Sequence, residues 1–386
     1  MKKTMVATAV AAVLALSACT DNKAPTQAAQ SAQPAATETA AAAVTNPLLA
    51  PSPLPFFAPE FDKIKVEHYQ PAMEQGIAEH AAEIEKIANN PEAATFENTI
   101  VAMEKSGSLL DRATSVFFNM TGTISNPEIL KIQTAMSPKL AAHSDNINLN
   151  PALFARVKAI YDNRANLQLD AEATRLVEVY YERFVRAGAL LTDEQKVKIR
   201  ALNEESSKLT NQFGQNLLKV TKDIAIFVDS KEQLAGMSEA EITAAAEGAK
   251  AAGKDGKFII NITNTTRQPV LTSLENRELR KQVWEASAFR AMSGETDNRP
   301  IVARLAQIRA ERAKLLGFDS WADYQLDTAM AKTPEAVMSM LDTMVPAVIE
   351  NSKLEAAAIQ EMIKASGGDF EVQPWDWEFY AEKVRK

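Results

Sequence analysis

The sequence predicts a mostly α-helical protein with a small β-sheet. Most of the chain after residue 55 consists of segments in which apolar residues recur every three or four positions behind a helix-capping residue. Only two runs, Ile224 to Val228 and Phe258 to Thr263, are β-branched or aromatic and bounded by charged or turn residues, as strands are. No repeating unit is apparent. We therefore expect a multi-helix fold in which these two runs form the sheet.

The expected helix boundaries follow from capping residues. Three segments begin with Ser or Thr followed three residues later by Glu or Gln, which is the spacing of a capping box. These pairs are, in chain order, Ser125 with Glu128, Thr192 with Gln195, and Ser238 with Glu241. Two more helices begin with proline, one from Pro300 to Gly317 and one from Pro334 behind Thr333 as its cap. Pro346 is expected to break or kink the last of these.

Residues 1–19 have the pattern of a lipoprotein signal peptide. Two lysines precede an apolar run that ends at Leu16, and the sequence Leu-Ser-Ala-Cys at residues 16–19 resembles a bacterial lipobox, where a lipid is attached to the cysteine. The alternative is an ordinary signal peptide with a chance cysteine. Cys19 is the only cysteine, so no disulfide forms within one chain. We expect a periplasmic lipoprotein, and the position of Asp21 favours the outer membrane.

Residues 20–55 are expected to form a flexible tether between the lipid and the folded part, residues 56–386. The segment is rich in Ala, Gln, Thr and Pro, with almost nothing large and apolar before Leu48, so it buries too little surface to offset its ordering entropy. A second helical domain is the alternative, but Pro25, Pro34 and Pro47 argue against it.

The charge distribution limits the partners. The formal net charge is -8, and lysines and arginines alternate with acidic residues along the predicted helices instead of forming a basic patch. This pattern excludes a nucleic-acid binder, for which a clustered basic surface is the characteristic feature. We expect a monomer.

Motifs of known chemistry are missing from the sequence. There is no phosphate-binding loop, no dinucleotide fingerprint, no G-x-S-x-G elbow, and none of the three histidines (His68, His80 and His143) is followed by glutamate as in H-E-x-x-H. On one straight helix His68 and His80 would lie about 18 Å apart and point in different directions, so they cannot share a metal. We treat the histidines as isolated and nominate no catalytic, cofactor-binding or metal-ligating residue.

Five segments, in a consistent order, resemble a known family. They are Leu54 to Ile77, Thr95 to Glu104, Leu209 to Leu218, Asn298 to Phe318, and Gln373 to Lys386. Together they are similar to the peptidyl-dipeptidase and oligopeptidase A branch of the thimet oligopeptidase family of zinc metallopeptidases. The last segment, QPWDWEFYAEKVRK, resembles peptidyl-dipeptidases more than other branches.

The resemblance implies a helical fold split by a deep groove that admits short unfolded peptides, with zinc held by two histidines and a glutamate. In the family those residues lie beyond the segment that resembles Trp375 to Lys386, and none has a counterpart here. We therefore expect the N-terminal part of a peptidase that releases C-terminal dipeptides, truncated before its zinc-binding helix. This chain would form one wall of the groove, bind no zinc and be inactive alone.

A different class of function stays open. The chain would then be a non-catalytic helical lipoprotein that binds peptides or scaffolds a partner. Either way, the terminal helix is expected to leave several bulky aromatic side chains uncovered, because the sequence ends directly after them. These side chains are Trp375, Trp377, Phe379 and Tyr380.

Overall fold

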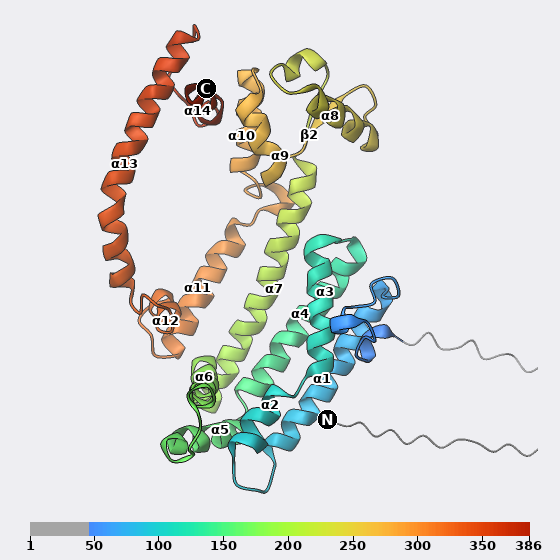
Figure 1. Cartoon of the computed structure of the whole chain (residues 1–386), viewed down its shortest axis with the longest axis vertical. Helices are drawn as coiled ribbons and strands as arrows, with labels where there is room; N and C mark the ends of the chain where they lie inside the picture. The colour runs from blue at the N-terminus through green and yellow to red at the C-terminus, as the bar shows by residue number, and fades with distance from the viewer. Residues whose placement is uncertain (1–45) are drawn as a thin grey trace, which may run out of the picture. The chain divides into compact units, whose positions relative to one another are not determined.

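The computed structural model describes residues 46–386, and it confirms the predicted fold class: helices dominate, and two short strands pair antiparallel (Figure 1). The predicted signal peptide with Cys19, and residues 20–45 of the predicted tether, lie outside the described residues. The helices are α1 Val66–Ala88, α2 Ala102–Glu104, α3 Ser108–Thr123, α4 Pro127–Asn148, α5 Pro151–Asn163, α6 Ala171–Ala187, α7 Asp193–Asp223, α8 Glu239–Ala251, α9 Asn264–Ser273, α10 Arg277–Ala288, α11 Arg299–Leu315, α12 Trp321–Leu326, α13 Pro334–Ala365 and α14 Trp377–Arg385. The shorter helical turns are η1 Pro47–Leu49, η2 Pro55–Phe57, η3 Phe96–Val101, η4 Arg164–Asn166, η5 Lys231–Leu234 and η6 Gly294–Thr296, and the strands are β1 Ile226–Val228 and β2 Phe258–Ile260.

The packed part of the chain begins before residue 55. Leu48 is buried in the core formed by α1, α3 and α4, and its carbonyl oxygen accepts a hydrogen bond of 2.9 Å from Nε of Arg112. The side-chain amide of Asn46 donates to the carbonyl of His68 on α1 at 2.8 Å. Residues 46–49 were expected to belong to the tether, but a single buried leucine and three side chain–backbone hydrogen bonds attach them to the helices.

The first layer of helices is held by close contact between α1 and α3. A Cβ atom added to Gly76 on α1 would lie 2.7 Å from Cα of Leu110 on α3, so only glycine permits this approach. Beside this contact the rings of Tyr69 and Phe117 pack with centroids 5.3 Å apart, and both residues are buried. The contact fixes the side of α1 that faces α4.

A buried arginine organises the neighbouring core around α5 and α6. Arg156 on α5 donates to the carbonyl oxygens of Asn90 and Glu92, each at 2.9 Å, and to the side chains of Asn98 and Thr99 at 2.8 and 3.2 Å. These partners all come from the segment between α1 and α2, so one guanidinium closes that loop onto α5. A buried donor with this many acceptors is well satisfied.

The long helix α7 connects the two ends of the structure described here. It packs against α4 on one side and α11 on the other (Figure 1). Its predicted capping box is present: Thr192 Oγ1 accepts from the Gln195 backbone, and the Gln195 side chain accepts from the Thr192 backbone. The box predicted at Ser238 and Glu241 is also present.

Two predicted helix starts are wrong by a residue. α11 begins at Arg299, whereas Pro300 was expected to be its first residue. α4 is capped by Asn126, whose Oδ1 accepts from the backbone N–H of Ile129 at 2.9 Å, whereas Ser125 was expected to be the cap. Both residues are good caps, and Pro127 decides between them because it prefers the first helical position. α13 begins at Pro334 behind Thr333 as predicted, but it runs through Pro346 and ends only at Ala365.

The two predicted strands form the sheet, with Ile226 opposite Ile260 and Val228 opposite Phe258. Both strands are shorter than the apolar runs that predicted them. Ile224 is used as the C-cap of α7, and Thr263 caps α9 by accepting from the Thr266 backbone. One end of each apolar run therefore caps a helix and does not extend the strand.

The expectation that the terminal aromatic residues are uncovered is wrong. Phe379 and Tyr380 are only 6% and 7% exposed, and they pack with Ile359 and Ile363 of α13. Trp375 and Trp377 are partly buried. Because α14 also packs against α9, the upstream helices supply the cover that the sequence pattern did not show.

The uncovered apolar surface lies on α13 instead. Every residue from 338 to 355 is exposed, and only Ile359 and Ile363 of this helix are buried. The exposed stretch is strongly apolar. Its large apolar residues are Met338, Met340, Leu341, Met344, Val345, Val348, Ile349 and Leu354. No helix within residues 46–386 combines the length and the apolar character needed to cross a bilayer.

Candidate functional site

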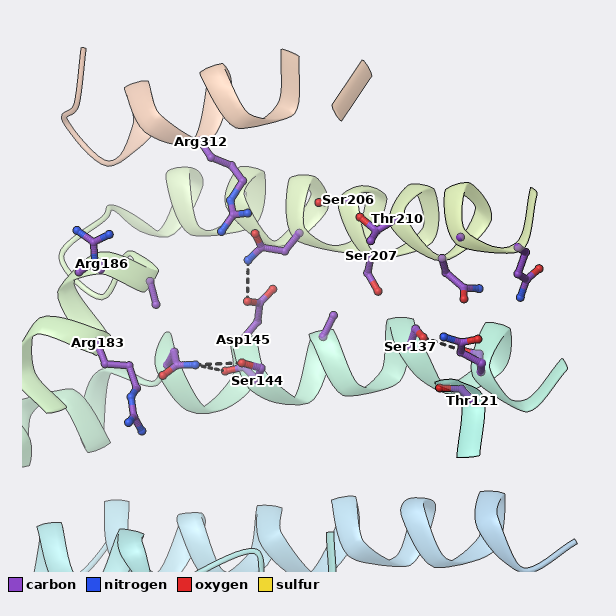
Figure 2. Close-up of a pocket in the computed structure, with 18 of the residues that line it drawn as sticks. Thr121, Ser137, Ser144, Asp145, Arg183, Arg186, Ser206, Ser207, Thr210 and Arg312 are labelled. Carbon is purple, nitrogen blue, oxygen red and sulfur yellow. Dashed lines mark hydrogen bonds between the residues drawn. The ribbon is translucent and has the colours of Figure 1, made fainter. Parts of the chain in front are cut away.

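A polar cavity of about 750 Å³ lies between α4 and α7 (Figure 2). Its lining comes mainly from one face of each helix, with arginines from α6 and α11 and Tyr324 from α12 near one end. The volume falls within the range of about 300–1,000 Å³ that small-ligand sites occupy. We take this cavity as the candidate functional site.

The α7 side of the cavity is a stripe of small polar residues at helical spacing. Positions separated by three and four residues lie on one face of a helix, where a globular helix normally places its apolar residues. The stripe consists of Asn203, Ser206, Ser207, Thr210, Asn211 and Gly214. On α4 the facing residues follow the same rule: Gln133, Ser137, Ala141, Ser144, Asp145 and Asn148.

This stripe is visible in the sequence, and we missed it. The apolar positions of the same helix, such as Phe213 and Leu217, are only partly buried. The signal was a run of hydroxyl and amide residues with a period of three to four inside a long helix. It predicts a polar helix face, although not the helix that lies opposite.

Hydrogen bonds fix some side chains of the cavity and leave other atoms without a partner. Asn203 donates to Oδ1 of Asp145 at 2.7 Å, and Asn211 donates to Oγ1 of Thr134 at 3.2 Å. Within the described part of the chain, Oδ1 of Asn203, Oδ1 of Asn211 and Nε of Arg312 are buried without a hydrogen-bond partner. Buried polar atoms are nearly always hydrogen-bonded, so three orphaned atoms in one cavity mark a place where a ligand or water completes the bonding.

The electrostatics of the cavity are dominated by arginine. Burial raises the pKa of the Asp145 carboxyl group, while the bond from Asn203 and the charges of Arg200 and Arg312 oppose that rise. Arg186 pairs with Asp327 at 2.9 Å. Arg183 and Arg312 have no carboxylate within 4.0 Å among residues 46–386. The cavity thus offers donors, acceptors and positive charge, which suit binding rather than covalent chemistry.

Two histidines that we treated as isolated are in direct contact. Nδ1 of His80 on α1 lies 3.0 Å from Nε2 of His143 on α4, and Nε2 of His80 lies 3.1 Å from Oγ of Ser106. They line a second cavity of about 690 Å³. His68 was correctly separated from them: its Nδ1 accepts from the Lys65 backbone at the start of α1.

The hydrogen bonds around this pair define its proton positions. Ser106 donates its one hydroxyl proton to the Met103 carbonyl at 2.7 Å, so it accepts from Nε2 of His80. Nδ1 of His80 is then an acceptor for Nε2–H of His143. Because the serine proton points away from the imidazole, Ser106 is not activated as a nucleophile.

The environment of the pair keeps both rings neutral. Burial lowers the pKa of His80 and of His143, and the neighbouring imidazole lowers the pKa of His143 further. Glu83 acts in the opposite direction on His80. Two imidazoles do not make a zinc site, and no group of three or more potential metal ligands occurs among the described residues.

Comparison with known proteins shows similarity to one family of peptidases. Residues 270–386 match the profile of "Peptidase family M3". Dipeptidyl carboxypeptidase of Salmonella typhimurium is 46% identical over 343 residues, which cover 89% of this chain and 50% of that protein. Its counterpart from Escherichia coli is 46% identical over 342 residues, covering 88% and 50%. The chain fits peptidase family M3. Oligopeptidase A of Salmonella typhimurium is more distant, at 27% identity over 348 residues, covering 89% and 50%.

The M3 match confirms the resemblance found in the sequence and sets its extent. The chain spans about half the length of the curated relatives it matches. Within the described residues, the segment that matches the M3 profile contains no group of three or more potential metal ligands. The predicted lipidation site, Cys19, lies outside the described residues.

The region that matches the M3 profile is built around a buried ion pair. Arg280 on α10 is 1% exposed, and its Nη2 donates to Oδ1 of Asp376 at 3.0 Å. Arg277 reaches the same carboxylate from the surface, with Nη2 2.8 Å from Oδ2. Arg280 also donates to the carbonyl of Trp375 at 3.1 Å and stacks on Phe379 with Cζ 4.1 Å from the ring centroid. This cluster holds the start of α14 against α10.

Proposed function

We propose that this chain is the N-terminal part of a lipid-anchored zinc peptidase of family M3 that releases dipeptides from the C-termini of short unfolded peptides. One observation carries the proposal. Identity to two dipeptidyl carboxypeptidases is 46%, against 27% to an oligopeptidase A over the same share of the chain. The higher identity to the dipeptidyl carboxypeptidases supports dipeptide release over internal cleavage as the proposed activity.

The proposal assigns different roles to the two halves of the longer protein. We assign zinc and the groups that act on the scissile bond to the remaining half, and the lack of a group of three or more potential metal ligands among the described residues is consistent with this assignment. Zinc, when bound there, would supply Lewis-acid chemistry at the peptide carbonyl. This chain would contribute one wall of the peptide groove, with the polar cavity between α4 and α7 as its binding surface.

The test compares this chain with the protein extended by the sequence that follows Lys386 in the gene. The substrate is an N-acetylated tetrapeptide offered with a free C-terminal carboxylate or as the C-terminal amide. We expect the extended protein to contain one zinc and to release dipeptides from the acid only, and a chelator to abolish release. The present chain should bind no stoichiometric zinc and cleave neither peptide.

Efficient internal cleavage of the amide would assign an oligopeptidase instead. Absence of any H-E-x-x-H sequence downstream, together with no hydrolysis, would favour the non-catalytic lipoprotein.

The exposed surface of α13 supports a longer protein. Met344 and Val348 are 52% and 57% exposed in the middle of an apolar stretch that packs against nothing in residues 46–386. A contiguous apolar patch of this kind commonly marks an interaction surface. In the longer protein we assign its cover to the remaining half.

A pair of substitutions tests this assignment. Met344→Glu with Val348→Glu should lower binding of a hydrophobic dye to this chain and weaken its association with the separately produced remaining half. Val197→Glu, at a residue that is 69% exposed on α7, is the matched control and should change neither. Association that survives the paired substitutions would place the contact elsewhere.

A further inference from the structure

The cavity between α4 and α7 contains orphaned atoms whose chemical type is fixed by their neighbours. An ionised carboxylate only accepts hydrogen bonds, so the Asn203 amide must turn its NH₂ group to Asp145. Oδ1 of Asn203 therefore faces away from Asp145, and it is an acceptor without a hydrogen-bond partner among residues 46–386. Exchange of its oxygen and nitrogen would set Oδ1 against the carboxylate.

The same argument determines the orientation of the Asn211 side-chain amide. The hydroxyl of Thr134 uses its one proton on the carbonyl of Leu130 at 2.9 Å, so it serves only as an acceptor for Asn211 and Gln215, at 3.2 and 2.7 Å. The Asn211 amide must then present NH₂ to Thr134, which leaves its Oδ1 as a second buried acceptor without a partner. Two acceptors of fixed type on one helix face call for N–H or O–H donors from a ligand.

Arg312 provides the complementary group. Its Nε is buried without a hydrogen-bond partner and its guanidinium has no carboxylate partner among residues 46–386, although it lies near the Trp321 ring at 5.4 Å. Arg183 also lines the cavity, and its guanidinium rests on the Tyr180 ring at 4.7 Å. A planar guanidinium with free N–H groups matches a carboxylate in a bidentate manner.

The charge around the cavity is positive in an acidic protein. Three arginines line it against the single carboxylate of Asp145, while the chain as a whole carries a formal charge of -8. One of the three, Arg186, is already paired with Asp327, so the other two carry the surplus. A positive concave site in a negative molecule attracts an anionic group.

The arrangement has a direction. Figure 2 shows Arg183, Arg186 and Arg312 toward the same end of the cavity as Asp145, and Ser137 and Thr210 toward the other end. A ligand with an anionic end and a neutral hydrogen-bonding body matches that polarity. A peptide has both: a carboxylate, and backbone N–H groups for the two asparagine oxygens.

We propose that the cavity between α4 and α7 binds a carboxylate-bearing short peptide, with Arg183 and Arg312 contacting the carboxylate and Asn203 and Asn211 accepting from backbone N–H groups. The proposal deepens the function proposed above, on which it rests for the choice of a peptide, and it places a substrate contact on this chain. The carboxylate is a C-terminus or an acidic side chain.

Binding to this chain itself, with no catalysis required, gives the first test. The probes are tetra-alanine with a fluorophore acylating its N-terminus as the free acid, the same peptide as the C-terminal amide, and the amide with one alanine replaced by aspartate. We expect the free acid to bind with an affinity that falls as salt increases, and at least about tenfold more tightly than the plain amide. Equal binding of acid and plain amide, or no binding at millimolar peptide, overturns the proposal.

The aspartate-containing amide separates the two sources of the carboxylate. Binding equal to that of the free acid shows that the site also accepts a side-chain carboxylate, and binding equal to that of the plain amide assigns the C-terminus. Either result keeps a carboxylate site at the arginines.

Variants locate the site. Arg312→Gln and Arg183→Gln should each weaken binding of the acid about tenfold or more, Arg312→Lys less than Arg312→Gln, and Asn211→Ala should weaken acid and amide alike. Arg175→Gln is the matched control, because Arg175 is an exposed arginine on α6 that does not line the cavity. Circular dichroism checks that each variant is folded, and unchanged affinity in folded Arg312→Gln and Arg183→Gln contradicts the proposal.

The extended protein separates failure of this inference from failure of the proposed function. If it is a dipeptide-releasing peptidase, Arg312→Gln should raise KM with little change in kcat, since the proposed role of the arginine is to hold the substrate carboxylate and not to act at the scissile bond. If the extended protein is an active peptidase and neither arginine substitution changes its KM, only the proposed binding site in the cavity is refuted. An inactive extended protein, with acid-selective binding intact in this chain, refutes the peptidase function alone.

Discussion

Replacing Asp376 by alanine removes the carboxylate that neutralises Arg280 in the interior. Asp376 is fully buried and Arg280 is 1% exposed, so the variant leaves a guanidinium in a nearly dry site. Loss of one partner from a buried ion pair costs about 3–5 kcal/mol, because the remaining charge is neither hydrated nor paired. Arg277 also loses its partner, but its side chain is 30% exposed and water replaces much of that contact.

The loss should appear as local opening of the terminal segment. Asp376 joins the start of α14 to α10: its carboxylate accepts three hydrogen bonds from Nε and Nη2 of Arg277 and one from Nη2 of Arg280. At a tenfold change for each 1.4 kcal/mol, about 3–5 kcal/mol raises the population of the opened segment by roughly a hundredfold to a few thousandfold. Elements far from this cluster, such as α1 and α3, should be unaffected.

Hydrogen exchange followed by mass spectrometry measures that opening peptide by peptide. We expect faster exchange in residues 374–386 and in α10, with unchanged exchange in α1. Arg304→Gln is the control: it breaks a two-bonded pair with Glu205 that is of similar geometry but solvent-exposed, and its effect should be small.

Two results would refute this reasoning. An increase in exchange below about fivefold for Asp376→Ala would mean that the buried pair contributes less than about 1 kcal/mol. The double variant Arg280→Met with Asp376→Leu replaces both charges by apolar groups and should recover most of the protection. Failure to recover it would show that the charges are needed for more than mutual neutralisation.

Three further predictions concern other parts of the chain. Burial holds the pKa of His80 and His143 below the ordinary value of 6.5, so the unfolded chain takes up protons before the folded chain does as the pH falls. The free energy of unfolding should therefore decrease as the pH falls below about 6.5. Urea denaturation across pH 5–7 should show this decrease, and His80→Gln or His143→Gln should make it smaller. Gly76→Ala should destabilise the chain by about 1–3 kcal/mol, since its Cβ would meet the backbone of α3 at 2.7 Å, whereas Gly122→Ala, with nothing within 4 Å, should not; equal urea midpoints would contradict the close contact. Cys19→Ser should leave the protein unprocessed or release it from the membrane fraction, and normal membrane fractionation of that variant would rule out lipidation.

The helices could be predicted because their signals lie within a few residues of sequence. Thr192 with Gln195 and Thr333 with Pro334 start their helices as expected, since a capping side chain contacts only the next turn. The cap of α4 moved from Ser125 to Asn126, where two adjacent residues compete for one role. The ends of the two strands were predicted wrongly for a related reason, because residues at one end of each apolar run cap a neighbouring helix.

Most of the candidate site could not be predicted in the same way. The polar stripe from Asn203 to Gly214 is legible in the sequence as a pattern, but its opposite wall on α4 is not, because the residues that face each other are more than 50 positions apart. The contact between His80 and His143 joins residues 63 positions apart. Local spacing carries no information on such pairs.

The sequence by itself determined the helical class, the position of the small sheet and the resemblance to family M3, all of which rest on local patterns or on runs of matching residues. Only the tertiary structure decided that the terminal aromatics are covered and that α13 is the exposed element. Phe379 and Tyr380 are buried because α13 folds back over α14 and supplies Ile359 and Ile363. Burial depends on what a distant segment places nearby, and a pattern along the chain specifies which face of a helix is apolar but not what covers it.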